Sequence, residues 1–198
     1  MMRNSAERYG AVAQLLHWLV MVLIVVQFVL GKLAEWAGER GGPAGLMEQF
    51  ALLTRHKSFG ITILTLAVVR LVWRAISPPP ALPDAMARTE RMLAKSVHWM
   101  FYVLLLFMPL TGWLMSSAAN FPTSYFGLFT LPDVVGPDDG LKETFEAVHH
   151  LGADALLLLV VLHVAATLKH HFWDGDNVLL RMLPFTTLRG AGRPEERR

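Results

Sequence analysis

The chain has 198 residues, of which 54% are hydrophobic and 17% are charged, and its formal net charge is +2. Soluble domains carry about 25% charged residues, so this composition indicates a membrane protein and excludes disordered, collagen-like and coiled-coil chains. A net charge this close to zero does not favour nucleic-acid binding. The chain has no cysteine, which excludes disulfides, thiolate zinc sites, iron–sulfur clusters and covalently attached c-type haem.

Two membrane-spanning helices are predicted in the first half of the chain, at about residues 10–32 and 56–76. Residues 9–31 contain no acidic or basic side chain except His17, and as a helix they would be about 35 Å long, enough to cross a bilayer. This run is too long for a removable signal peptide. The second helix is expected to end where three prolines begin at Pro78.

Two further spans are predicted at about residues 96–117 and 149–172, and Pro109 predicts a kink in the first of them. The aromatic stretch at residues 121–129 is expected to lie at the membrane interface. It is either a belt that anchors the edge of the bundle or a lid that limits access to a site.

The predicted fold class is therefore an all-α membrane protein with four transmembrane helices in a bundle. It is expected to be one domain over residues 1–184, followed by a basic, disordered tail at 185–198. Of the 18 Lys and Arg side chains, 13 lie at the N-terminus, around the loop after the second span or after the fourth span. By the positive-inside rule, both termini are expected in the cytoplasm and the other two loops outside.

Histidines give the most specific functional indication. His149 and His163 are 14 residues apart on the fourth span, so they share one helix face and are separated by about 21 Å along the axis. His17 lies at the depth of His163 in the membrane, and His56 lies at the depth of His149. Two imidazole pairs at different depths are what bis-histidine coordination of two haems in a helix bundle requires.

Three more residues lie close to these pairs in the predicted helices. Gly60 and Gly152 are each within about one turn of a paired histidine and are expected to leave room for a flat macrocycle. His98, near the start of the third span, is interpreted either as a proton-handling or quinone-contacting residue or as an interfacial hydrogen-bonding residue.

Several motifs, at their mutual spacing, resemble the bacterial cytochrome b561 family from Glu7 to about Pro184. The stretches that carry the resemblance are Glu7-Arg8-Tyr9-Gly10 with His17-Trp18, His56-Lys57-Ser58-x-Gly60, Arg70-x-x-Trp73-Arg74 running into Ser77-Pro-Pro-Pro, and Leu162-His163 with Lys169-His170-His171-Phe172. The resemblance implies two b-type haems whose irons are held by His17 with His163 on the inner side and by His56 with His149 on the outer side. The depth argument selects the same four residues.

The resemblance further implies a multi-pass protein of the bacterial inner membrane, surrounded by lipid, that exchanges electrons with ubiquinone near the cytoplasmic haem. Candidate residues for the quinone site are His98, His170, His171 and Arg70. Arg70 can alternatively bind haem propionates or lipid phosphates, or act only as a charged flank of the span. The expected class is an oxidoreductase that uses quinone and takes electrons from a periplasmic donor, either a protein or superoxide.

One feature argues against superoxide as the donor. The outer loop from Asp133 to Glu146 contains five acids and only Lys142 as a base, whereas a positive field helps to capture an anion. Four bases near the outer histidines could still form a local positive funnel, so superoxide stays open as a donor: Lys32, Arg40, Arg55 and Lys57.

Two other functions also stay open. The histidines could form the relay of a proton or metal transporter, although Asp154 is the only acid within a predicted span and no inverted repeat is apparent. The protein could instead be the cytochrome b anchor subunit of a partner dehydrogenase or hydrogenase, which would change only the electron donor.

Overall fold

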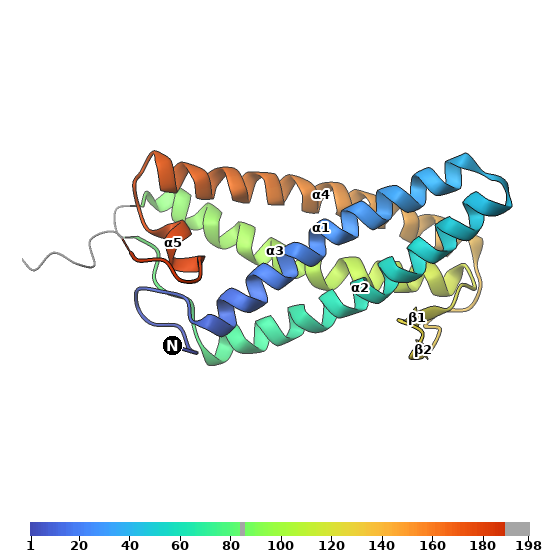
Figure 1. Ribbon diagram of the computed structural model, residues 1–198, viewed down its shortest axis with the longest axis horizontal. Coiled ribbons are helices and arrows are strands. Elements are labelled where there is room, and N and C mark those ends of the chain that lie inside the picture. The colour runs from blue at the N-terminus through green and yellow to red at the C-terminus, as the bar shows by residue number, and fades with distance from the viewer. Residues whose placement is uncertain (84–85, 189–198) are drawn as a thin grey trace, which may run out of the picture.

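The computed structural model describes residues 1–83 and 86–188, and four long helices dominate it (Figure 1). They are α1, Ala11–Arg40; α2, Gly42–Ile76; α3, Arg88–Ala118; and α4, Asp139–Phe172. The smaller elements are β1, Thr123–Tyr125; β2, Phe129–Leu131; and the short helix α5, Val178–Met182. Each of the four helices is long and apolar enough to cross a membrane, which confirms the predicted all-α membrane fold.

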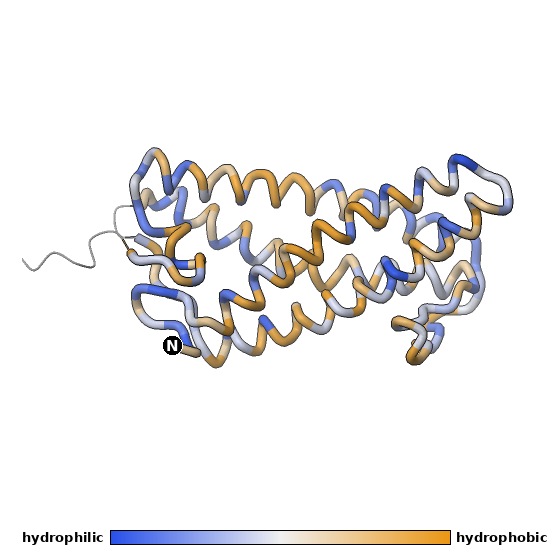
Figure 2. The backbone as a smooth tube through the Cα atoms, in the orientation of Figure 1, coloured by the Kyte–Doolittle hydropathy of each residue, from blue (hydrophilic) through white to orange (hydrophobic). Residues whose placement is uncertain are grey.

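The two ends of the bundle are built differently (Figure 1). The terminal end holds the start of α1, the end of α4 and α5, whereas the hairpin end holds the turn between α1 and α2 and the antiparallel pair β1–β2. Figure 2 shows that hydrophobic residues follow the middle of the helices and that hydrophilic residues gather toward both ends. This distribution suits a bilayer, where hydrocarbon surrounds the middle and backbone polar groups must be satisfied within helices.

A central apolar layer holds the four helices together. In this layer α1 packs along α2, α2 along α3, and α3 along α4. All four helices contribute buried side chains to it, and these are Val20, Leu23, Ile24, Ile63, Ala67, Leu105 and Leu156. The layer lies between the two depths at which histidines were predicted to pair.

The helices extend beyond their predicted ends, so several predicted boundaries are wrong. The first was predicted to end near residue 32 and the second to begin near 56, but only Gly41, with φ of 61°, separates α1 from α2. The third begins at Arg88 rather than near residue 96. The fourth begins at Asp139 rather than near 149. The length of an apolar run in the sequence indicates only the part of a helix that lies inside the bilayer. The polar ends of these helices continue beyond it, and exposed ion pairs such as Lys32 with Glu35 stabilise them.

The segment after α4 folds back onto α1. Trp18 donates from Nε1 to the carbonyl of Met182 at 3.0 Å. Arg8 donates to the carbonyls of Leu183 and Thr186, both at 2.6 Å. The predicted disordered tail at 185–198 therefore begins with residues that are fixed to the bundle, and its residues 189–198 lie outside the described part of the chain.

The aromatic stretch after α3 forms the β1–β2 hairpin on the side of α2, which the sequence did not indicate. Its turn has positive φ at Phe126 (49°) and Gly127 (74°), as in the tight turns that match the twist of a hairpin. Ser58 of α2 is buried, and its hydroxyl accepts from the backbone N–H of Phe126 at 2.9 Å and lies 3.0 Å from the carbonyl of Ser124. The hydroxyl has one proton to share between this carbonyl and that of Thr54, which lies at 2.9 Å, so its firm contribution to the hairpin is to accept from Phe126.

Replacing Ser58 with Ala leaves the backbone N–H of Phe126 without its acceptor and is expected to loosen the hairpin, at a cost of about 1–3 kcal/mol. Hydrogen exchange of residues 121–131, measured in detergent micelles by mass spectrometry, should become faster. Thr65→Ala is the matched control, because the exposed Thr65 hydroxyl bonds only to the carbonyl of Ile61 on its own helix. Equal exchange in both variants would contradict the role given to Ser58.

Candidate functional site

Four histidines face one another in two pairs, one on each side of the central apolar layer. At the terminal end, the ring centres of His17 on α1 and His163 on α4 are 6.3 Å apart. At the hairpin end, the ring centres of His56 on α2 and His149 on α4 are 6.2 Å apart. These are the two groupings that the depth argument predicted.

Each pair joins two helices whose backbones do not pack closely. Among the four long helices, the closely packed pairs are α1 with α2, α2 with α3 and α3 with α4, whereas the histidine pairs connect α1 with α4 and α2 with α4. The imidazoles therefore meet across the wider spaces between helices. Such a space is where a four-helix bundle holds a cofactor.

At the hairpin end, Thr111 orients the ring of His149. The Thr111 hydroxyl donates to the carbonyl of Met108 at 2.9 Å, and it lies 3.0 Å from Nδ1 of His149. Since its only proton goes to Met108, the hydroxyl accepts from an N–H at Nδ1. This tautomer leaves the Nε2 lone pair of His149 free to bind a metal.

Two glycines lie against the rings of the hairpin-end pair. A Cβ at Gly112 of α3 would come 3.3 Å from Cε1 of His149, and one at Gly31 of α1 would come 3.7 Å from Cε1 of His56. Gly60 and Gly152 do not lie against these rings, because a Cβ at Gly60 would meet Gln27 and one at Gly152 would meet the sulfur of Met108. That they leave room for a macrocycle stays a prediction.

At the terminal end, a third imidazole and an arginine accompany the pair. The ring centre of His98 lies 5.5 Å from that of His163. Phe101 lies against the same ring, also at 5.5 Å. Arg70 of α2 places Nη2 3.0 Å from Nδ1 of His17. Two of the four residues predicted for a quinone site, His98 and Arg70, thus lie directly at the terminal-end pair.

Comparison with known proteins identifies the family to which this arrangement belongs. The prokaryotic cytochrome b561 family matches residues 8–185. The chain belongs to the prokaryotic cytochrome b561 family. It is 35% identical to cytochrome b561 homolog 2 of Escherichia coli over 181 residues, which cover 91% of this chain and 93% of the relative.

Two further relatives match over a similar length. Cytochrome b561 homolog 1 of Escherichia coli is 25% identical over 178 residues, covering 90% of this chain and 98% of the relative. A probable superoxide oxidase of Yersinia pestis is 29% identical over 178 residues, covering 90% of this chain and 97% of the relative. This chain is thus an integral membrane electron-transfer cytochrome of a family that binds haem b.

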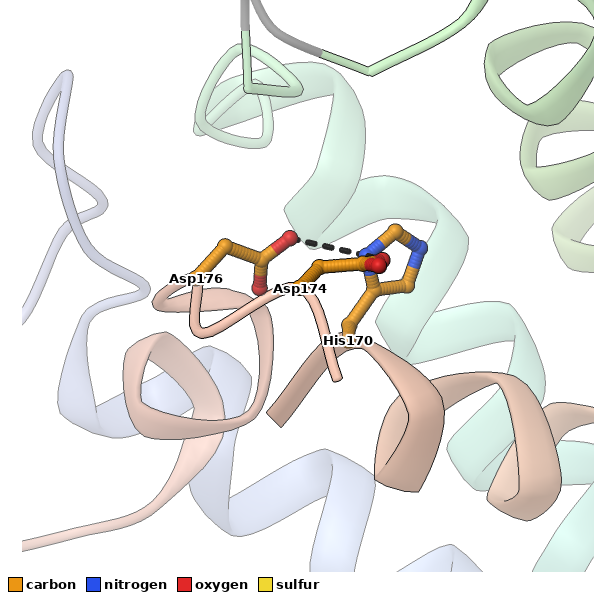
Figure 3. A group of neighbouring side chains, drawn as sticks. All are labelled: His170, Asp174 and Asp176. Carbon is orange, nitrogen blue, oxygen red and sulfur yellow. Dashed lines mark hydrogen bonds and ion pairs between the residues drawn. The ribbon is translucent and has the colours of Figure 1, made fainter. Parts of the chain in front are cut away.

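The other two quinone-site candidates of this cytochrome, His170 and His171, lie at the end of α4. Figure 3 shows His170 enclosed by the turn that follows the helix, where its Nδ1 lies 2.9 Å from Asp174 and 2.8 Å from Asp176. Asp174 also pairs with Lys169 at 2.9 Å. The Nδ1 of His170 is therefore used in contacts within this turn. His98, by contrast, packs directly on the ring of His163.

Sequence reasoning missed Thr111, Gly112 and Gly31 because each becomes important only through a ring on another helix. One signal was available in the sequence. Gly31 and Gly112 both lie near the outer ends of their predicted spans, at about the depth assigned to His56 and His149. A glycine at the depth of a predicted ligand on a neighbouring span is thus more informative than one on the ligand's own helix.

Replacing both Asp174 and Asp176 with Asn removes the two anionic partners of His170, so the turn is expected to open more often. Hydrogen exchange of residues 173–182 in detergent micelles should become faster, while exchange in the middle of α4 should not change. Asp133→Asn combined with Glu143→Gln, two exposed acids of the opposite end, controls for the change in net charge. If the turn exchanges at the wild-type rate in the double variant, the ion pairs do not hold it.

Proposed function

We propose that this cytochrome transfers electrons across the bacterial inner membrane, between a periplasmic donor and ubiquinone at the cytoplasmic side. The observation that carries the proposal is the separation of the paired imidazoles, 6.3 and 6.2 Å between ring centres. A metal–nitrogen bond of about 2 Å on each side, plus about 1.1 Å from each nitrogen to its ring centre, predicts about 6.2 Å for two imidazoles on one metal.

The donor set suits haem b. His17 with His163 would hold one haem iron and His56 with His149 the other, so each iron would have two imidazole ligands and no open position. A haem held in this way supplies reversible one-electron exchange. Gly31 and Gly112 keep side-chain bulk away from the rings at the hairpin end, which supports a flat group bound there.

The positive-inside rule supports cytoplasmic termini, and with them a quinone site at the terminal end. His98 is the strongest candidate for that site, because it packs directly on the ring of His163 and can exchange a proton at its own nitrogens. Arg70 is next to His17, whereas His170 is held by two carboxylates in the turn after α4. His171 lies beside it and is a weaker candidate.

Superoxide is the second candidate for the donor, beside a periplasmic protein. It is favoured by the similarity to the probable superoxide oxidase of Yersinia pestis and by Lys57, which directly follows His56. Two of the four bases expected to attract an anion are neutralised, because Lys32 pairs with Glu35 and Arg40 with Glu48, both at 2.6 Å. Rapid mixing of the oxidised protein with superoxide, or with a reduced periplasmic extract, distinguishes the two donors by the rate at which haem absorbance changes.

The haem assignment predicts which variants lose which haem. Ala at His56 or His149 should remove the haem at the hairpin end, and Ala at His17 or His163 should remove the other, so that each variant retains about half of the wild-type haem absorbance. The measurement is the reduced-minus-oxidised spectrum, with haem content per chain. His150→Ala is the control, because His150 is exposed and adjacent to His149. A purified wild-type protein without haem absorbance would falsify the proposal.

Thr111→Val should raise the reduction potential of the haem at the hairpin end. An acceptor at Nδ1 makes the imidazole a stronger donor to the metal, so its loss favours the reduced state. A redox titration should show a shift of about 20–60 mV, equivalent to at most about tenfold in the equilibrium constant of this one-electron couple. The haem at the terminal end is the internal reference, and a shift there of equal size would show that the effect is not local.

A further inference from the structure

Arg70 is a cation within a membrane span that has no anionic partner among the described residues. Its Nη2 lies 3.0 Å from Nδ1 of His17, and its guanidinium carbon lies 5.7 Å from the ring centre of Tyr102, whose neutral hydroxyl also hydrogen-bonds to it. Within the described residues, no carboxylate lies within ion-pair distance of Arg70. Charged side chains inside membrane spans are normally paired. The described residues thus supply no negative group that neutralises the charge of Arg70.

A second tyrosine near this arginine, Tyr9, does not supply the negative charge. Tyr9 precedes α1. The positive charges of Arg74 and Arg70 lower the pKa of its phenol, but burial has the larger effect and raises this pKa above the usual value. Its phenol therefore stays neutral. Arg74 does not compete for the same partner, since its guanidinium lies over Trp99 and Tyr102, at 5.5 and 5.8 Å from their ring centres.

The contact between Arg70 and His17 is also incompatible with metal binding by that ring. A guanidinium has only donors, so Nδ1 of His17 must accept, and the proton of the neutral ring is then on Nε2. His149 has the opposite tautomer, because Thr111 accepts from its Nδ1. For His17 to bind iron through Nε2, the guanidinium of Arg70 has to leave Nδ1 and find another acceptor.

We propose that this acceptor is a propionate carboxylate of the haem held by His17 and His163, and that Arg70 exchanges the ring of His17 for the carboxylate when haem binds. The inference rests on the proposed function. A guanidinium presents two parallel N–H donors that match the two oxygens of a carboxylate. The positive and negative charges of such a pair cancel. Arg70 is thus a positioning residue for the haem, and the exchange frees Nδ1 of His17 to carry the proton.

The test uses the purified holoprotein with haem labelled with carbon-13 at its propionate carboxyl carbons, made by growing cells on labelled 5-aminolevulinate. In the redox-difference infrared spectrum, only bands of the propionates move with the label. Arg70→Gln is expected to shift at least one of these bands. It should also lower the equilibrium constant for reduction of the terminal-end haem about tenfold, or about 59 mV, because an uncompensated carboxylate favours the oxidised iron.

Arg74→Gln is the matched control, since it removes a cation one turn further along α2 whose guanidinium lies over the rings of Trp99 and Tyr102. It should leave the labelled bands at their wild-type positions. Should Arg70→Gln lose the haem, Arg70→Lys keeps the charge without the paired donors, and it should retain the haem with a labelled band that differs from wild type.

Labelled bands at wild-type positions in the Arg70 variants, or an equal shift in Arg74→Gln, would overturn the inference. Failure of the proposed function has a different signature, because either the wild-type protein would then lack haem absorbance or His17→Ala would retain both haems.

Discussion

The spacing of two histidines on α4 is the constraint on which the arrangement of the other helices depends. His149 and His163 are 14 residues apart, so they return to one face within about 40° and are separated by about 21 Å along the axis. That face meets a ring from α2 at the hairpin end and a ring from α1 at the terminal end. In Figure 1, α1 runs obliquely to α4.

The two pairs solve the same problem with different chemistry. An imidazole inside an apolar bundle needs a partner for the nitrogen that does not face its pair. At the hairpin end a neutral hydroxyl, Thr111, accepts from the ring of His149 and fixes its tautomer. At the terminal end a cation, Arg70, donates to the ring of His17. The first contact prepares the ring for a metal, whereas the second must be broken, so the hairpin-end ligand is better preorganised for haem than the terminal-end ligand.

The sequence was sufficient for the features that depend on one helix at a time. Span number, the shared face of His149 and His163, and their depth relative to His17 and His56 all follow from helical geometry and apolar length. It was not sufficient for features that depend on contacts between segments. Gly112 matters only because a ring from α4 packs on it, and the polar extension of α1 and α2 to the turn at Gly41 depends on a small separate cluster of Ala34, Ala37 and Leu52.

The choice between belt and lid for the aromatic stretch is decided by helix geometry on α2. Ser58 and Thr62, which hold the hairpin, are four residues apart and share a face. His56 is two residues before Ser58, which places it about 200° away around the helix. The hairpin therefore packs on the side of α2 that faces away from the pair of His56 and His149, and its contacts with α2 and α3 join these two helices. The aromatic stretch thus holds α2 in position for its histidine and does not cover the pair.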